Sequence, residues 1–273
     1  MKARPTMARD LDRYEKYGWD YPIVAPLSEE ETRWHIQWAR RTGGPVLGLA
    51  CGTGRLLCRL AEDRFDTVGI DLSDTMLQVA RGHRATLPPE ARKRLHLVKA
   101  DMSRFDLGRS FGLVLIADNS FRELPTRKAL LACLRCIRRH LLPTGRLLIT
   151  ERRFDPDLYP SGVRSFGWSQ PVVHRQTGHL VSRKGHIHIS RDRRRMRGEF
   201  TYKTCAPDGS ETIDELPWSG PILTRSEYLW LFAAAGFHTE VFGDYHSTEP
   251  SSQPRLWCFV CSVRTGRKTR TEV

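Results

Sequence analysis

Between residues 45 and 151, short and mostly apolar runs alternate with stretches whose apolar positions recur at helical spacing. The runs are typical of buried strands and cover residues 46–49, 67–70, 95–99, 111–116 and 145–151. Residues 55–62 and 126–140 carry the helical pattern. This alternation of strands and helices predicts βαβ units and an α/β fold.

A further helix is predicted in front of this core, over residues 27–41. Ser28 is placed to be its N-cap, three glutamates follow in the first turn, and two glycines end it at residue 43. An aromatic cluster precedes this helix, with spacing too irregular for an amphipathic helix. Its members are Tyr14, Tyr17, Trp19 and Tyr21.

After residue 151 the alternation stops and a β-rich segment begins. Residues 155–222 show β-type patches separated by turn residues, and His186 to Ile189 alternates polar and apolar positions as a half-exposed strand does. Thr224 and Glu227 then form the pattern of a capping box at the start of a helix, 223–235. Two closing strands are predicted at 237–245 and 255–263.

The chain is strongly basic, with 44 Lys and Arg against 31 Asp and Glu among 273 residues and a net charge of +13. Such an excess raises the question of nucleic acid as a partner. No run approaches the ~18 apolar residues that a membrane span requires. We therefore expect a cytoplasmic protein that makes no membrane contact.

Cysteine and histidine do not predict a metal site. The seven cysteines lie within apolar strands and helices, so a disulfide framework is not expected and a reducing compartment fits better. Two pairs have C-x-x-C spacing, but residues three apart in the predicted strand 255–263 point to opposite faces. No acidic pair accompanies the histidines of the β-rich segment. The residues considered are Cys133, Cys136, Cys258, Cys261, His174, His179, His186 and His188.

The strongest chemical feature is a glycine turn that follows the first strand. Gly52 and Gly54 lack a Cβ, so the chain can turn sharply and a ligand can approach the backbone. Asp71 ends the second strand 17 residues later, where a carboxylate can accept both hydroxyls of a ribose. Leu57 stands where a dinucleotide-binding motif has its third glycine, which disfavours a pyrophosphate ligand.

Three motifs in this order resemble the class I S-adenosylmethionine-dependent methyltransferases. They are Val-Leu-x-Leu-Ala-Cys-Gly-Thr-Gly-Arg from Val46, Gly-Ile-Asp-Leu-Ser-Asp-x-Met-Leu from Gly69, and Ala-Asp-Met from Ala100. The resemblance implies a Rossmann-like, seven-stranded α/β sheet. It also implies an antiparallel β insertion between the fifth strand and the last helix, as in glycine and amino-sugar N-methyltransferases.

The resemblance further implies that the cofactor is S-adenosylmethionine and that S-adenosylhomocysteine is the product. The glycine turn would pass under the methionine part, Asp71 would hold the ribose, and Met76, Asp101 and Met102 would lie at the adenine. The full set expected at the cofactor is Ala50, Gly52, Thr53, Gly54, Arg55, Asp71, Leu72, Met76, Asp101, Met102 and Asp118.

In relatives, the loop after the fourth strand lies beside the reactive methyl group, so Asp118 to Phe121 is expected to border the acceptor pocket. A hydroxyl acceptor would need a group that takes its proton. The candidates are Asp118, Tyr17, Glu151 and His246, each of which also has a purely structural interpretation.

Gly48 departs from the family pattern, in which Asp or Glu at this position helps to anchor the amino group of the cofactor. Three explanations remain open at this point. A backbone carbonyl near Ala117 or Asp118 substitutes for the carboxylate, the affinity for the cofactor is lower, or catalysis has been lost.

The sequence therefore predicts a methyltransferase that acts on nitrogen, oxygen or carbon of a small metabolite. The alternatives are an RNA methyltransferase, favoured by the arginine-rich run 191–197, and a cofactor-binding protein without catalysis. Nucleic acid is not the expected partner, and a homodimer is left open. The expected parts are a cofactor-covering segment (1–44), the cofactor-binding core (45–154), a β lid (155–222), a closing helix and strands (223–263) and a disordered basic tail (264–273).

Overall fold

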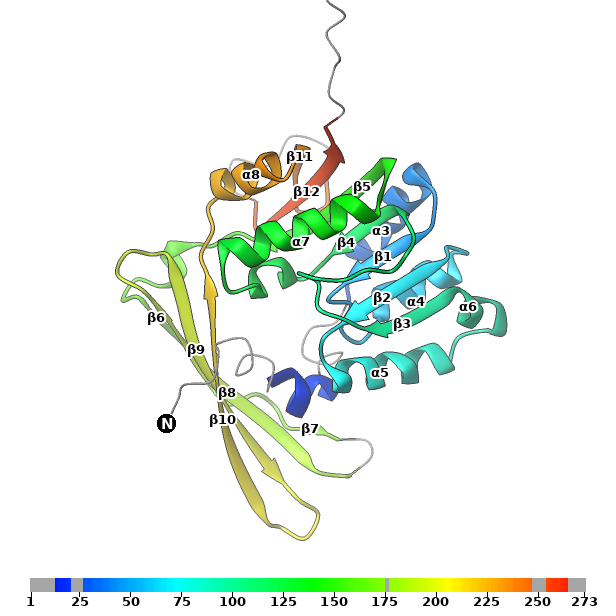
Figure 1. Cartoon of the computed structure of the whole chain (residues 1–273). Helices are drawn as coiled ribbons and strands as arrows, with labels where there is room; N and C mark the ends of the chain where they lie inside the picture. Colours follow the sequence, from blue (N-terminus) through cyan, green and yellow to red (C-terminus); the bar gives the residue numbers. More distant parts are fainter. Residues whose placement is uncertain (1–12, 21–26, 175–176, 247–253, 265–273) are drawn as a thin grey trace, which may run out of the picture.

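The computed structural model describes residues 13–20, 27–174, 177–246 and 254–264. Two β-sheets dominate it, a large one covered by helices and a smaller antiparallel one beside it (Figure 1). The expected basic tail beyond residue 264 and Tyr21 of the aromatic cluster lie outside the described residues. No helix in the described part of the chain is long and apolar enough to cross a membrane.

The large sheet has seven strands in the order β11-β12-β5-β4-β1-β2-β3. The strands from β1 to β5 pair in parallel, whereas β12 pairs antiparallel with both β5 and β11. This arrangement confirms the predicted sheet. Its strands are β1 (Val46–Leu49), β2 (Thr67–Asp71), β3 (Leu95–Lys99), β4 (Phe111–Ile116), β5 (Leu141–Arg152), β11 (Phe237–Gly243) and β12 (Leu256–Val263).

Helices cover both faces of the large sheet and enclose two apolar cores. The core on one face includes buried side chains of α7 and α8, and the core on the other includes side chains of α3, α4 and α6. Helices α5 and α6, which the sequence analysis did not identify, connect β2 to β3. The helices are α3 (Glu29–Thr42), α4 (Arg55–Glu62), α5 (Asp74–Ala85), α6 (Pro89–Arg94), α7 (Arg127–His140) and α8 (Arg225–Ala234), with the 3-10 turns η1 (Gly18–Asp20), η2 (Ser120–Glu123) and η3 (Pro156–Leu158).

The smaller sheet is inserted in the chain between β5 and α8, which confirms the predicted antiparallel insertion. Its strand order is β10-β9-β8-β6, and β7 pairs with β8. The strands are β6 (Val163–Phe166), β7 (Val172–Val173), β8 (Leu180–Ile189), β9 (Arg195–Cys205) and β10 (Glu211–Pro221). The arginine-rich run forms the turn between β8 and β9 and the first residues of β9. In the turn, Arg193 N donates to the carbonyl of Ser190 at 2.8 Å.

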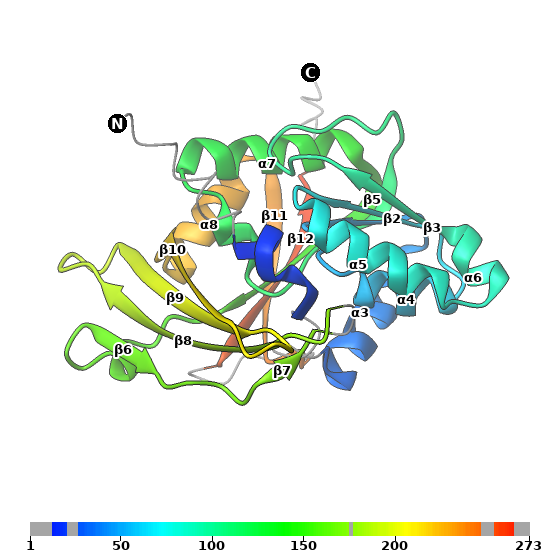
Figure 2. The same cartoon turned by 90° about the horizontal axis from the view of Figure 1, so that it is seen from below.

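Residues 13–17 are helical and continue into η1, although their aromatic pattern did not predict an amphipathic helix. The pattern did not predict the helix because the aromatic side chains of this segment pack in different directions. Tyr14 donates to Glu123 of η2, Tyr17 stacks on Tyr202 of β9 at 3.8 Å, and Trp19 meets the edge of His174. The segment therefore lies between the smaller sheet and α5, as Figure 2 shows from below.

The four cysteines with C-x-x-C spacing pack in the apolar cores. Cys258 and Cys261 belong to the cores on opposite faces of the large sheet, as their spacing in a strand predicts, and Cys133 and Cys136 share one core. Across the described ranges, no group of three or more His, Cys, Asp or Glu side chains could hold a metal ion.

Candidate functional site

A pocket opens at the carboxyl ends of β1, β2 and β4. The strand order reverses here, since β2 lies on one side of β1 and β4 on the other. Open α/β sheets bind their ligands at such a switch point. The topology and the glycine turn therefore indicate the same place.

The glycine turn forms the floor of this pocket. Ala50, Gly52 and Gly54 have φ angles of 48°, 55° and 73°, and the left-handed region is strained for residues that carry a Cβ. A Cβ on Gly54 would lie 3.0 Å from the Cβ of Ala80, so this glycine also lets α5 approach. The turn thus exposes bare backbone to a ligand directly before α4 begins.

Asp71 is held in a fixed orientation beside the turn. One carboxylate oxygen accepts the backbone N–H of Gly52 at 2.7 Å, and the other accepts that of Ser73 at 2.9 Å. Burial raises the pKa of this carboxyl, and the backbone hydrogen bonds oppose that shift. Each oxygen keeps a further lone pair, so the carboxylate can accept both hydroxyls of a ribose.

An apolar wall stands next to Asp71, where an adenine ring can pack. Leu72, Met76, Ala100 and Met102 contribute to it, and the sulfur of Met76 lies 4.0 Å from the position that a Cβ on Gly52 would take. Asp101 lines the same region, and one of its oxygens accepts the backbone N–H of Ser103 at 2.8 Å. These residues fit an adenosine.

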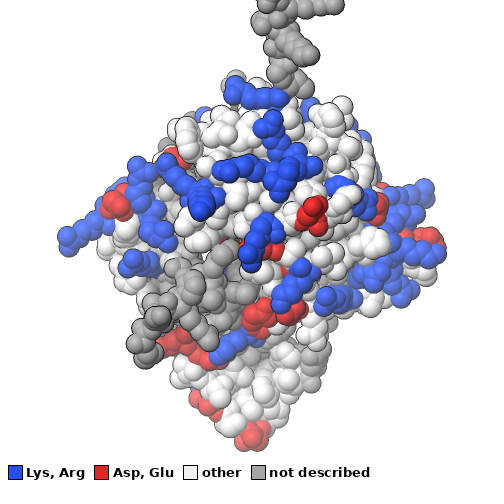
Figure 3. All heavy atoms as spheres, in the orientation of Figure 1, with Lys and Arg blue, Asp and Glu red and all other residues white. Residues whose placement is uncertain are grey.

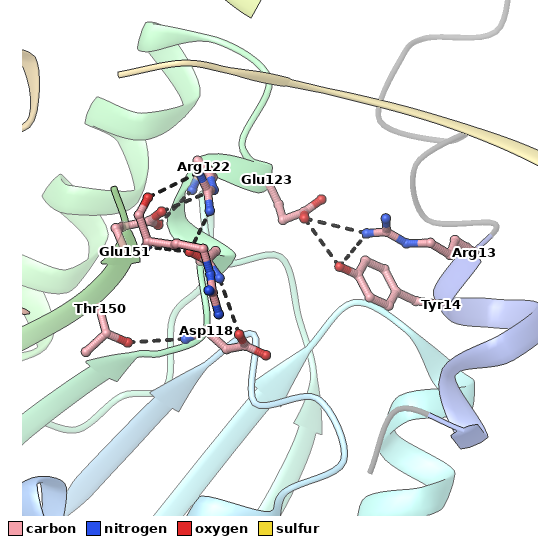
Figure 4. A network of polar contacts seen from close by, with 9 residues as sticks. Arg13, Tyr14, Asp118, Arg122, Glu123, Thr150 and Glu151 are labelled. Atoms are coloured by element: carbon pink, nitrogen blue, oxygen red, sulfur yellow. Dashed lines mark hydrogen bonds and ion pairs between the residues drawn. The ribbon is translucent and has the colours of Figure 1, made fainter. Parts of the chain in front are cut away.

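The loop after β4 borders the pocket on the side opposite Asp71, and Figure 4 shows the polar contacts that hold it. Asp118 and Asn119 both have positive φ angles, 51° and 65°. The backbone N–H of Asp118 donates to Thr150 Oγ1 at 3.2 Å, and Asn119 Oδ1 accepts the N–H of Arg152 at 2.6 Å. β5 thereby fixes the strained loop that presents the Asp118 side chain to the pocket.

A second polar contact joins the N-terminal segment to the same loop. Tyr14 Oη donates to Glu123 Oε1 at 3.3 Å, and Arg13 donates to Tyr14 Oη at 2.6 Å (Figure 4). Burial and the charge of Glu123 raise the pKa of the Tyr14 hydroxyl, so it stays protonated as a donor. Both Tyr14 and Glu123 line the pocket, although neither was a candidate from sequence.

All residues expected at the cofactor line this pocket except Gly54, which is the N-cap of α4 directly behind the lining. Among the four candidates for proton transfer, Asp118 is the one that lines it. Tyr17 points to the smaller sheet and donates to Asp214 Oδ2 at 2.7 Å. Glu151 is fully buried behind the loop, where it pairs with Arg122 at 3.3 Å. His246 is exposed, with its Nε2 3.6 Å from Glu30. The geometry gives these three side chains no direct access to the pocket.

Two further expectations about the acceptor side need correction. Phe121 does not border the pocket, because its ring is fully buried. It packs against Phe232 of α8, with 6.1 Å between the ring centroids. The smaller sheet contributes none of the described lining residues. Arg13 and Tyr17 contact that sheet instead, so the N-terminal segment lies between it and the pocket.

The pocket is acidic within a basic protein. Its described lining has one cationic side chain, Arg55, against the five carboxylates Glu31, Asp71, Asp101, Asp118 and Glu123. Figure 3 shows Lys and Arg side chains spread over the outer surface, where they include the basic last turns of α6 and α7. The lining favours cationic ligands, in contrast to the net charge of the whole chain.

Comparisons with known proteins agree with this geometry. A family model described as "Methyltransferase domain" matches residues 46–145. The chain is 34% identical over 196 residues to the dTDP-3-amino-3,6-dideoxy-alpha-D-glucopyranose N,N-dimethyltransferase of Streptomyces fradiae, which covers 71% of this chain and 70% of that protein.

Two further matches cover as much of the chain or more. The dTDP-3-amino-3,4,6-trideoxy-alpha-D-glucopyranose N,N-dimethyltransferase of Streptomyces venezuelae is 32% identical over 198 residues, or 71% of this chain and 76% of that protein. The crystal structure of the sugar N-methyltransferase KedS8 from Streptoalloteichus superposes with a TM-score of 0.69 at 26% identity. That superposition covers 91% of this chain and 93% of the other.

Proposed function

Because this chain belongs to the S-adenosylmethionine-dependent class I methyltransferases, we propose that it methylates an amino group on a small, sugar-like metabolite. The acidic lining of the pocket carries this proposal. An amine with an ordinary pKa reaches the protein as an ammonium ion, and carboxylates attract and orient such a cation. The relatives named above act, by their names, on amino groups of nucleotide-linked sugars.

The cofactor site fits S-adenosylmethionine on the observations above. We assign the ribose to Asp71, the adenine to Met76 and Met102, and the rest of the cofactor to the glycine turn, and their common position at the pocket supports this assignment. The cofactor supplies a methyl group on a positively charged sulfur, which becomes neutral in an in-line displacement. The protein's task is to align the acceptor and to exclude water.

Asp118 and Glu123 are the residues that we assign to the acceptor. Both line the pocket on the side of the β4 loop, and Tyr14 holds Glu123 in place. A carboxylate here orients the ammonium form and takes up the proton that the amine must lose before it can attack. The carboxylate releases this first proton to solvent, and it can then accept the proton that the methylated nitrogen must lose before a second methyl transfer.

To test this, the purified protein is incubated with methyl-labelled S-adenosylmethionine and with each of two matched acceptors. The first is a nucleotide-linked 3-amino sugar of the kind that the relatives methylate, and the second carries a hydroxyl in place of the amine. We expect label only in the amine, with mass increases for one and then two methyl groups. Transfer to the hydroxyl compound, or to neither while S-adenosylhomocysteine binds, would contradict the proposal.

The basic surface favours RNA as a second candidate acceptor. Within the arginine-rich turn, however, Arg194 already pairs with Glu227, which also pairs with Arg127 of α7. The carboxylates of the lining would repel a phosphate backbone that entered the pocket. We therefore rank RNA below an amine-bearing metabolite.

We also expect a cytoplasmic protein. Light scattering would measure whether it is a monomer or a homodimer.

A further inference from the structure

Leu57 occupies the space where family members place a carboxylate on β1. A Cβ built on Gly48 would lie 3.0 Å from both methyl carbons of Leu57. That separation is tighter than ordinary packing allows, so a longer side chain at 48 would have to displace the leucine. The pocket therefore cannot take its anchor for the cofactor's amino group from this strand.

Glu31 brings a carboxylate to the same part of the pocket from a different element. The helix α3 precedes β1 and packs beside α4 and β4, so its first turn lies at the carboxyl end of β1. Ser28 caps this helix by accepting the backbone N–H of Glu31 at 3.0 Å. The side chain of Glu31 lines the pocket together with Gly48 and Leu57.

Arg55 compensates the negative surroundings of the Glu31 carboxylate only in part. Among the described residues, no hydrogen bond or ion pair engages its carboxylate. Burial and the negative charge of Asp118 raise the pKa of Glu31 to about 7, and Arg55 opposes that shift. A partly buried carboxylate that faces another carboxylate is costly unless a cation joins it. The pocket therefore favours a further positive group beside Glu31, contributed by a ligand.

Arg55 supplies the opposite charge at the same end. Its guanidinium lies near enough to Glu31 to affect that carboxyl, and its Nε donates to Thr53 Oγ1 at 3.2 Å. It is the one cationic side chain in the described lining. A carboxylate and a guanidinium side by side match the ammonium and carboxylate groups of an α-amino acid.

We propose that Glu31 binds the α-ammonium group of S-adenosylmethionine, in place of the carboxylate that β1 lacks, and that Arg55 binds its α-carboxylate. This assignment rests on S-adenosylmethionine as the cofactor and is independent of which acceptor is methylated. Glu31 is then a binding residue that acts on the amino-acid end of the ligand, while Asp71 acts on the ribose.

Calorimetric titration with two ligands distinguishes binding of the amino-acid end of the cofactor from binding of its nucleoside. S-adenosylhomocysteine carries the amino acid, whereas 5′-methylthioadenosine has the same nucleoside and thioether without it. We expect Glu31→Gln to weaken binding of S-adenosylhomocysteine about 10- to 100-fold, because a charge-assisted hydrogen bond is lost. Binding of 5′-methylthioadenosine should change less than about twofold. Arg55→Gln should show the same selectivity.

Glu29→Gln is the matched control, since it removes the same charge from the same first turn of α3 and from an exposed position. It should leave both affinities unchanged. The proposal is overturned if Glu31→Gln binds S-adenosylhomocysteine as tightly as the wild type, or if it weakens both ligands equally. Thermal unfolding of each variant checks that the fold is kept. Tight binding without methylation of any amine would count against the proposed acceptor and leave this inference intact.

Discussion

The carboxylate of Asp71 accepts the backbone N–H of Gly52 at 2.7 Å, which ties the end of β2 to the glycine turn after β1. The residue expected to bind the ribose thus also shapes the turn beneath the ligand. Substitution of Asp71 will therefore affect both the affinity for the cofactor and the order of the turn.

We expect Asp71→Ala to weaken binding of S-adenosylhomocysteine by about 1.5–3 kcal/mol, since a charged acceptor for the ribose is lost. Binding of 5′-methylthioadenosine should fall by a similar factor, because it carries the same ribose. Titration calorimetry measures both. Asp66→Ala is the control, because Asp66 directly precedes β2 and pairs with Arg109 at 2.6 Å on the surface. Unchanged affinity in a folded Asp71 variant would sink the ribose assignment.

Glu123→Gln tests the acceptor side of the pocket. It keeps the shape of the side chain but removes the charge that attracts an ammonium group, so kcat/KM for an amine should fall about tenfold or more, or about 1.4 kcal/mol. Affinity for S-adenosylhomocysteine should not change. Tyr14→Phe removes the hydroxyl that donates to Glu123 and should give a smaller loss. Steady-state kinetics would disprove the assignment if both variants behaved like the wild type.

Gly48→Glu tests whether the pocket can accept a carboxylate on β1. Because Leu57 fills that space, we expect the free energy of unfolding to fall by about 1–3 kcal/mol, with no gain in cofactor affinity. Gly82→Glu introduces the same residue into α5, where nothing lies within 4 Å of an added Cβ, and should not destabilise by this mechanism. A Gly48→Glu protein that was stable and bound S-adenosylhomocysteine more tightly would show that Leu57 yields.

Stability should depend on pH through Glu151. Burial raises the pKa of this carboxyl to about 7, above its ordinary value of 4.5, against the opposing charge of Arg122. The native state therefore holds its proton more tightly than the unfolded state does. This stabilising contribution is complete below about pH 4.5 and is lost as the pH rises through 7. Denaturant unfolding at pH 5 and pH 8 measures this dependence. Between these two pH values, the free energy of unfolding should fall less for Glu151→Gln than for the wild type.

The arginine-rich turn should be dispensable for methylation of a metabolite. Replacing Arg193, Arg194 and Arg195 by alanine leaves every described lining residue in place, so turnover of the small acceptor should be largely retained. If RNA were the substrate, affinity would fall steeply with salt, by a slope of about −0.7 per phosphate contact for single strands. Loss of RNA methylation in this triple variant would establish RNA as the acceptor instead.

The centre of the large sheet could be predicted from the sequence because β1, β2 and β4 are short, buried and bounded by clear turns. The strand β5 begins at Leu141, before the predicted start at residue 145. The predicted capping box at Thr224 also located the start of α8 within two residues, since Thr224 caps this helix through a side-chain hydrogen bond. The N-terminal helix was missed because Tyr14 and Tyr17 pack against different partners. A periodicity argument detects a single buried face and does not register such packing.

The residues assigned to the cofactor could be chosen from local motifs, whereas those assigned to the acceptor depend on contacts distant in sequence. Glu123 and Tyr14 are 109 residues apart and meet only in the folded chain. Glu31 could have been found from topology, because a helix that runs back along β1 must place its first turn at the carboxyl end of that strand. The three consecutive glutamates gave no reason to choose the third.

The packing of Leu57 also limits how the sequence can change. Its side chain covers Gly69 as well as Gly48. A Cβ built on Gly69 would lie 2.6 Å from Leu57 Cδ1. A carboxylate on β1 is accommodated without moving Leu57 only if residue 57 is smaller, and that smaller residue alone would leave a cavity costing about 2–5 kcal/mol. Positions 48 and 57 therefore form an epistatic pair, in which either step alone is penalised. Directed evolution by single substitutions should leave the anchoring carboxylate on α3.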